Sequence, residues 1–389
     1  MNIESKISQT VKDIKPSGIR KFFDIANQME DVISLGIGEP DFVTPWHIRD
    51  AGILSLEKGR TYYTSNSGLI ELREQLCRYL DRRFNLKYDE DEILVTVGGS
   101  EAIDLCVRAL VSPGDEVLIP EPSFVCYSPC TLLAGGVPVP IVTDEEHNFK
   151  LTAEALKKAI TPKTKLLVLP FPNNPTGGVM ERGDLEEIAK VLEGTEIMIL
   201  SDEIYGELTY GIKHTSIANI ESMKDRTIIV GGFSKCYAMT GWRLGYAAGD
   251  KAVINQMRKI HQFAIMSAPT TSQYAAVEAV RNGDSDIEDM KREYNKRRRY
   301  LIDRLNEIGL HCFEAKGAFY VFPSIKSTGL SSDEFCERLL KEKKVAVIPG
   351  NAFGNSGEGF VRISYAYSLN TIKKALDRIE EFIKELKTE

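Results

Sequence analysis

Short apolar runs alternate with longer amphipathic stretches through the middle of the chain. The runs occupy residues 93–97, 116–119, 165–169, 196–200 and 227–230, with helical periodicity between them at 101–111 and 184–192. Such alternation is typical of a mostly parallel sheet with helices on both faces. Ligands bind these sheets at the carboxyl ends of the strands. We therefore expect an α/β fold with its site at that edge.

The pattern changes after about residue 285. Residues 286–308 form a long charged amphipathic stretch, and strand signals follow at 317–322, 345–348 and 359–364. We expect a large domain over residues 45–285 and a smaller α+β domain made of residues 1–44 and 286–389. The stretch Lys296-Arg297-Arg298-Arg299 predicts a solvated helix face, with a polybasic patch as the alternative.

Composition narrows the function classes. The 389 residues carry a net charge of −7, which argues against a nucleic-acid-binding protein. The N-terminus does not resemble a signal peptide, and we find no apolar run of the ~18 residues that a membrane span needs. Seven cysteines without a C-x-x-C pair predict reduced thiols and a cytoplasmic location, and the scattered histidines predict no metal site.

Polar residues follow two of the apolar runs directly. Gly98-Gly99-Ser100-Glu101-Ala102 opens a helix after the first run, which suits an anion at a helix N-terminus but also a plain turn. Asp202-Glu203-Ile204-Tyr205 follows the run at 196–200. A buried aspartate there needs a cationic or hydrogen-bonding partner, unless it is a helix N-cap.

Two further runs end in the same way. Pro170 to Gly178 reads as a turn, yet a cis Asn174–Pro175 bond would turn the amide inward. Ser234 and Lys235 follow the run at 227–230, and Arg243 comes eight residues later. A buried lysine is sensible where its pKa is lowered or its amine is bound as an imine, and arginine suits phosphate or carboxylate. Pyridoxal 5′-phosphate (PLP) would satisfy all of these groups.

The chain resembles the class I/II aminotransferases, which are PLP-dependent enzymes of fold type I. The resemblance runs nearly end to end and rests on an ordered series of motifs: Leu35-Gly36-Ile37-Gly38-Glu39-Pro40-Asp41-Phe42, Tyr63-Thr64 with Gly68, Glu71-Leu72-Arg73, Gly98 to Ala102, Pro122-Ser123-Phe124, Asn174-Pro175-Thr176-Gly177, Asp202 to Tyr205, Ser234-Lys235, Gly241-Trp242-Arg243-Leu244-Gly245 and Arg362.

This resemblance implies roles for the catalytic residues. Lys235 would be the Schiff-base lysine and then the base that moves the substrate Cα proton. Asp202 would keep the pyridine nitrogen protonated, while Asn174 and Tyr205 would hydrogen-bond its phenolic oxygen. Phe124 would stack on the ring, with Tyr127 as a second candidate.

The resemblance also implies how the remaining groups are held. The phosphate would meet the backbone of Gly99, Ser100 and Glu101, together with Ser234 and Arg243. Tyr63 would reach the phosphate of a neighbouring subunit, which implies a homodimer. The substrate would contact Gly38, Phe124, Asn174 and Arg362, with Arg362 forking onto its α-carboxylate.

The expected activity is ping-pong transfer of an amino group from an L-amino acid to a 2-oxo acid. A carbon–sulfur β-lyase on the same fold is the alternative, because it would use the same lysine, aspartate and arginine. A PLP-binding regulator would need a DNA-binding module, for which we see no room before Leu35. A dinucleotide enzyme would need G-x-G-x-x-G, and Gly36-x-Gly38 lacks the third glycine.

Substrate choice is expected to come from residues 16–23, the Ser100 region and residues 261–269. Some aspartate-specific relatives place a lysine where this chain has Ser100, so a strict aspartate specificity does not follow. Arg20 offers another partner for an acidic side chain.

Overall fold

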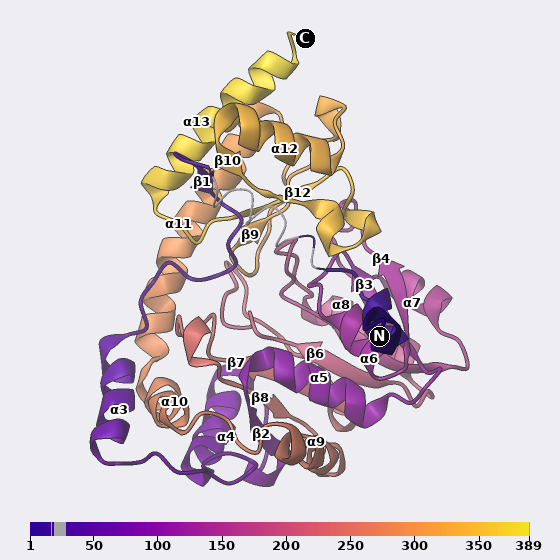
Figure 1. Cartoon of the computed structure of the whole chain (residues 1–389), viewed down its shortest axis with the longest axis vertical. Coiled ribbons are helices and arrows are strands. Elements are labelled where there is room, and N and C mark those ends of the chain that lie inside the picture. Colours follow the sequence, from indigo (N-terminus) through magenta and orange to yellow (C-terminus); the bar gives the residue numbers. More distant parts are fainter. Residues whose placement is uncertain (17, 19–28, 389) are drawn as a thin grey trace.

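The centre of the molecule is a seven-stranded sheet enclosed by helices, with a second group of strands and helices above it (Figure 1). A computed structural model describes residues 1–16, 18 and 29–388. The strands of the large sheet are β2 (Ile93–Thr96), β3 (Glu116–Glu121), β4 (Val137–Val142), β5 (Thr164–Leu169), β6 (Met198–Asp202), β7 (Thr227–Gly232) and β8 (Gly245–Ala248).

These strands lie in the order β2-β8-β7-β6-β5-β3-β4. Neighbours from β7 to β4 run parallel, whereas β8 is antiparallel to both β2 and β7. The central strands are almost continuously apolar because helices cover both faces of the sheet. The predicted α/β fold is confirmed.

Two strands of the large sheet were not predicted from the sequence. β4 contains Pro138 and Pro140, which weaken a strand signal, and it forms an edge of the sheet, where proline is tolerated. β8 is a four-residue strand of small side chains, GYAA, without the β-branched residues that mark most strands.

Helices pack on this sheet and on one another, with α5 against α9 and α10 against α3 and α4. Their bounds are α3 (Trp46–Glu57), α4 (Ile70–Phe84), α5 (Gly98–Leu110), α6 (Tyr127–Leu133), α7 (Ala153–Ala159), α8 (Arg182–Leu192), α9 (Lys251–Ala264) and α10 (Thr270–Asn282).

The second group of elements contains two small sheets. β1 (Ile33–Ser34) pairs in parallel with β10 (Val345–Ala346), and β12 (Val361–Ser364) lies between β9 (Tyr320–Val321) and β11 (Ile348–Pro349). Three helices accompany them: α11 (Asp284–Ile308), α12 (Ser332–Lys343) and α13 (Leu369–Leu386). The apolar stripe of α13 is buried at Ile372, Leu376, Ile379 and Ile383, a spacing that keeps one helix face inward.

The expected solvated face at residues 296–299 is wrong for its two central arginines. Arg297 and Arg298 are buried. Arg297 Nη1 donates to both oxygens of the Asp41 carboxylate, at 2.8 and 2.9 Å, and Arg298 Nη1 donates to the Ala315 carbonyl at 2.8 Å. Buried charges persist because these partners compensate for the loss of water, and charge density alone did not reveal them.

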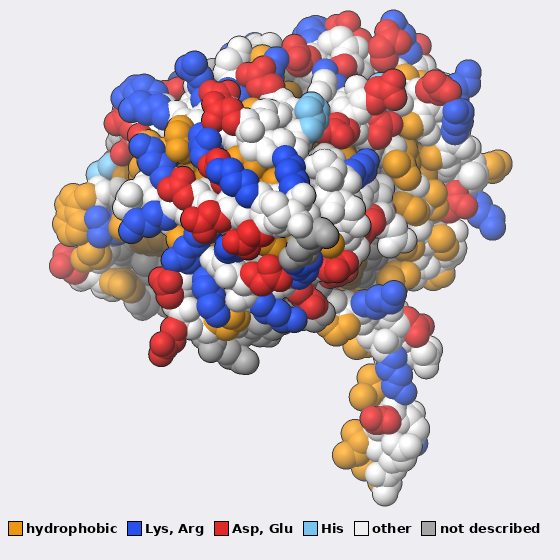
Figure 2. All heavy atoms as spheres, turned by 90° about the horizontal axis from the view of Figure 1, so that it is seen from above, with side chains coloured by type: hydrophobic (Ala, Val, Ile, Leu, Met, Phe, Trp, Pro, Cys, Tyr) orange, Lys and Arg blue, Asp and Glu red, His pale blue; other side chains and the backbone are white. Residues whose placement is uncertain are grey.

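The surface mixes acidic and basic side chains, and the N-terminal segment projects from the body (Figure 2). All side chains of residues 1–13, which include α1 (Gln9–Asp13), are exposed. None of the helices in the described part of the chain is long and apolar enough to cross a membrane.

Candidate active site

A cavity of about 270 Å³ opens beyond the carboxyl ends of β5, β6 and β7 and is closed on its other side by β9 and β12. It brings together most of the predicted site residues: Gly38, Gly99, Ser100, Phe124, Asn174, Asp202, Tyr205, Ser234, Lys235, Arg243 and Arg362. Residues from the first forty positions to the last thirty thus converge on one enclosed space, as the strand-end pattern predicted.

Lys235 follows β7 and lines this cavity. Its ammonium group donates a hydrogen bond to the Gly38 carbonyl at 2.7 Å, and it forms no ion pair among the described residues. Burial lowers the pKa of the Lys235 amine to about 8, although the more distant Glu39 carboxylate opposes this shift. Roughly a tenth of the amine is therefore neutral and nucleophilic at pH 7, far more than for a lysine with the ordinary pKa.

Asp202 is the last residue of β6 and is buried at the cavity wall. The Tyr127 hydroxyl donates to Asp202 Oδ2 at 2.7 Å, and the backbone N–H of Ile204 donates to Oδ1 at 3.2 Å. Burial raises the pKa of Asp202 to about 6, because these neutral donors only partly replace water. A cationic group in the cavity would stabilise this carboxylate as an anion.

Tyr127 was considered only as a stacking ring. The structure instead directs its hydroxyl to Asp202, while its ring meets Phe124 edge to face with centroids 6.2 Å apart. The contact joins the start of α6 to the end of β6, 75 positions later in the chain. Its sequence neighbourhood carries no signal for a contact over that separation.

Arg362 lies on β12 and is buried. Its Nη1 donates to Asn174 Oδ1 at 2.9 Å and its Nη2 to the Gly36 carbonyl at 2.5 Å, while Nε is buried without a partner. The rings of Tyr320 and Phe353 lie 4.5 and 4.8 Å from the guanidinium carbon. Burial lowers the pKa of Arg362.

The partners of Arg362 are all neutral, since no described carboxylate pairs with it. Burying an unpaired cation is costly unless an anion completes the arrangement. The cavity therefore contains a preformed place for a carboxylate. The Asn174–Pro175 bond is cis, as considered for this turn, and the Asn174 amide faces Arg362.

The N-terminus of α5 forms a second place for an anion. Its first turn contains Gly98, Gly99 and Ser100, whose backbone N–H groups have no partners within the helix. A Cβ at Gly98 would lie 2.7 Å from Arg243 Nη2, and Gly98 also has a positive φ of 75°. Glycine thus lets the arginine approach this turn. Arg243 itself is exposed in the single chain and adopts a left-handed φ of 54°.

Two tyrosine hydroxyls meet inside the cavity. Tyr205 and Tyr320 are buried, and their hydroxyl oxygens lie 3.0 Å apart. Tyr205 comes from the loop after β6, whereas Tyr320 begins β9. The sequence analysis placed a strand at residues 317–322 but assigned no role to Tyr320, because a tyrosine in a short strand is ordinary core material.

Buried carboxylates fix the loop that carries Tyr205 on both of its sides. Glu203 accepts hydrogen bonds from Ser201, His214 and Ser216, and its side chain is buried. Glu207 accepts from the Tyr79 hydroxyl at 2.7 Å.

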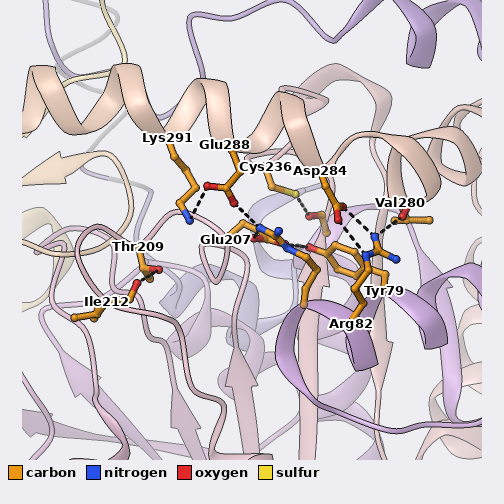
Figure 3. A network of polar contacts seen from close by, with 12 residues as sticks. Tyr79, Arg82, Glu207, Thr209, Ile212, Cys236, Val280, Asp284, Glu288 and Lys291 are labelled. Carbon is orange, nitrogen blue, oxygen red and sulfur yellow. Dashed lines mark hydrogen bonds and ion pairs between the residues drawn. The ribbon is translucent and has the colours of Figure 1, made fainter.

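Arg83 completes the second of these anchors. Its Nε and Nη2 donate to the Glu207 carboxylate at 2.9 and 2.6 Å, and Nη2 also reaches Glu288 on α11 at 2.8 Å (Figure 3). One guanidinium thereby connects α4, the loop after β6 and α11. The loop is held by charge-assisted hydrogen bonds rather than by packing alone.

Two predicted cofactor residues lie outside the cavity lining. The Glu101 carboxylate accepts from the Val97 backbone N–H and pairs with the buried His261 at 2.7 Å, so only its backbone remains available for the predicted contact. Tyr63 is 76% exposed, as a residue that reaches another subunit would be. Arg20 and most of the expected specificity segment 16–23 lie outside the described residues.

Comparisons with known proteins agree with this geometry. The family model for aminotransferase class I and II matches residues 30–379. The aspartate aminotransferase of Pyrococcus abyssi is 48% identical over 96% of this chain and 97% of its own length. The aromatic-amino-acid aminotransferase 2 of Thermococcus litoralis is 46% identical over 98% of this chain and 99% of its own length. A solved structure of the aspartate aminotransferase from Thermus thermophilus with maleate superposes with a TM-score of 0.92. It is 37% identical, and the match covers 96% of this chain and 99% of that one.

Proposed function

Because the chain belongs to the class I and II aminotransferases, we propose that it transfers amino groups with PLP bound in the cavity around Lys235 and Asp202. The family membership establishes an aminotransferase of fold type I and does not support the β-lyase alternative. The cofactor, the residue roles, the substrates and the assembly are the parts that we propose.

The observation that carries the cofactor proposal is the pairing, in one cavity, of an amine whose pKa is lowered to about 8 with a buried carboxylate. PLP offers an aldehyde to Lys235 and a pyridine nitrogen to Asp202. Its phosphate suits the N-terminus of α5, Ser234 and Arg243. Its flat ring suits the face of Phe124.

When bound, PLP supplies an electron sink that acidifies the Cα–H bond of an amino acid. Lys235 would hold the cofactor through its amine, and that amine would take the substrate Cα proton and return it. Asp202 would stay ionised and hold a proton on the ring nitrogen. At an effective dielectric constant of 20, opposite charges 4 Å apart attract by about 4 kcal/mol, compared with roughly 0–1 for a surface pair.

Asn174 and Tyr205 donate hydrogen bonds to the phenolic oxygen of the cofactor in this proposal, and Asn174 Oδ1 also accepts from Arg362. Arg362 binds the α-carboxylate that every amino acid and 2-oxo acid substrate carries, beside the Gly38 backbone. This shared anchor supports a ping-pong cycle, because both half-reactions then use one site.

We propose that the amino donors include aspartate and the aromatic amino acids, which appear in the names of two relatives. Ser100 at the cavity cannot form an ion pair with an acidic side chain, whereas Ile103 offers an apolar contact. These features favour acceptance of aromatic donors alongside aspartate.

A matrix of amino donors against 2-oxoglutarate, pyruvate and glyoxylate tests the substrate proposal. We expect turnover with aspartate and with at least one aromatic donor, and none for the Lys235→Ala variant. Turnover confined to donors outside both groups would overturn the proposed substrates without affecting the cofactor proposal.

We further propose a homodimer in which Tyr63 reaches the partner's phosphate site. Large apolar side chains are exposed on Tyr63's own segment and on the segment beside it, including Tyr62, which is 66% exposed, and Phe263, which is 82% exposed. Asn66 Nδ2 donates to the Met266 carbonyl, so the segments around Tyr63 and Phe263 adjoin. Exposed apolar patches of this kind mark protein interfaces.

Sedimentation of the Phe263→Asp variant tests the dimer, with Val137→Asp on the edge strand β4 as the control. We expect the first variant alone to shift toward the monomer mass. We propose the division into residues 45–285 and residues 1–44 with 286–389, because β1 pairs with β10 and because β9, β11 and β12 form a sheet of their own. A cytoplasmic location is proposed because the cysteines of the described chain are free thiols.

A further inference from the structure

Tyr320 occupies a position between the two halves of the proposed site. It is paired with Ser364 in the β9–β12 ladder, so Arg362, two residues before Ser364, lies on the same face of the sheet as Tyr320. The Tyr320 ring lies 4.5 Å from the Arg362 guanidinium carbon. The Tyr320 side chain therefore touches the carboxylate site with its ring and Tyr205 with its hydroxyl.

The place of the Tyr320 hydroxyl is shaped by Gly38. A Cβ at position 38 would lie 2.6 Å from the Tyr320 hydroxyl oxygen, closer than non-bonded atoms allow. The carbonyl of Gly38 accepts the hydrogen bond from Lys235. A glycine here allows the hydroxyl to sit beside the lysine's backbone acceptor and within hydrogen-bond distance of Tyr205.

The direction of the Tyr205–Tyr320 hydrogen bond follows from counting protons. Each hydroxyl has one hydrogen to donate. On the proposed function, Tyr205 uses its hydrogen toward the cofactor's phenolic oxygen, and its own oxygen can then only accept. Tyr320 must be the donor. Burial raises the pKa of Tyr320, which keeps this hydroxyl protonated near neutral pH.

We propose that Tyr320 is a positioning residue whose hydroxyl donates to Tyr205 and thereby fixes Tyr205 as a donor toward the cofactor. The proposal rests on the proposed function and deepens it. Hydrogen bonds in a chain polarise one another, so accepting a bond from Tyr320 makes Tyr205 a stronger donor. Stronger donation to the phenolic oxygen lowers the proton affinity of the Lys235 nitrogen that joins the cofactor to the protein.

The Tyr320→Phe variant removes the hydroxyl and keeps the ring over Arg362. We expect the pH midpoint of the absorbance change of the PLP-loaded enzyme to rise by about 0.3–1 pH unit. Tyr205→Phe should raise it further. In the Tyr205→Phe background, adding Tyr320→Phe should produce no additional shift, because Tyr320 acts through Tyr205.

Tyr210→Phe is the matched control. Tyr210 is buried like Tyr320 but does not line the cavity. The variant loses the hydrogen bond that the Tyr210 hydroxyl donates to the Ala318 carbonyl. We expect its midpoint to equal that of the wild type, even if its melting temperature falls. An unchanged midpoint in Tyr320→Phe, or an equal shift in both backgrounds, would overturn the role of Tyr320. Failure of the wild type itself to bind PLP would instead overturn the proposed function.

Discussion

The buried surroundings of Lys235 make its amine a better nucleophile than that of an ordinary lysine. Its amine is held against one backbone carbonyl and loses proton affinity through burial. Asp202 shows the opposite shift for the same reason, since burial disfavours the charged form of either group. Both groups have thus lost water that would stabilise their charged forms, and a bound ligand can supply the missing interactions.

The lowered pKa of Lys235 predicts a pH profile for cofactor attachment. Only the neutral amine attacks an aldehyde, so the rate at which PLP attaches to the cofactor-free enzyme should rise with pH and reach half of its maximum near pH 8. Stopped-flow absorbance measures this rate. A midpoint near 10.5, the ordinary value for lysine, would contradict the proposed surroundings of the amine.

Arg362 predicts a matched loss in both half-reactions. Arg362→Lys keeps a cation but loses the planar fork, and kcat/KM for amino donor and 2-oxo acid should fall alike, by about 100-fold or more. The control is Arg298→Lys, a buried arginine that donates to Ala315 away from the cavity. It should change kcat/KM by less than about 3-fold. A loss confined to one half-reaction would argue against a shared carboxylate anchor.

At the scale of elements, polar anchors hold the loop after β6 between α4 and α11. Glu203 is bonded within this part of the chain by His214, whereas Glu207 finds its partner Arg83 on the distant helix α4. The ends of several strands and the mostly parallel character of the sheet could be predicted from apolar runs, and with them Asp202, Asn174 and Lys235. Tyr127 and Tyr320 could not, because their importance comes from contacts that only the folded topology creates.

The Glu207–Arg83 anchor predicts a large stability difference between adjacent arginines of α4. Glu207→Ala or Arg83→Ala leaves a charge without its buried partner and should cost about 2–4 kcal/mol of unfolding free energy. Arg82→Ala, which breaks the exposed pair with Asp284, should cost at most about 1 kcal/mol. Urea unfolding compares them, and equal losses would show that the buried pair contributes no more than a surface pair.

His47 connects α3 to α10 and α11 and predicts a pH-dependent contribution to stability. Burial lowers its pKa, but hydrogen bonds to Asp286 and Glu278 outweigh this and raise it above 6.5. Its stabilising effect is therefore fully present below the unfolded value and is lost as pH rises through the higher folded value.

Comparing the melting temperatures of the wild type and His47→Asn tests this sign. The wild type should exceed the variant more at pH 5.5 than at pH 8.5. A difference that grows with pH would show that neutral His47, rather than its charged form, holds the three helices together.

Over the whole molecule, the site exists only because both groups of strands contribute to it. β6 and β7 present Asp202 and Lys235, while β12 presents Arg362. Gly38, from the N-terminal part of the chain, accepts a hydrogen bond from the Lys235 amine through its carbonyl. In the proposed dimer, the exposed Tyr63 would contribute in the same way to the site of a second subunit. This assembly explains why motifs spread over nearly the full chain describe a single cavity.

Trapping the bound cofactor identifies the lysine that holds it. The enzyme is incubated with PLP, reduced with borohydride and digested, and the labelled peptide is identified by mass spectrometry. The account predicts one pyridoxyl group per chain, on Lys235, and none in Lys235→Ala. Labelling of a different lysine, or an unlabelled but active enzyme, would contradict it.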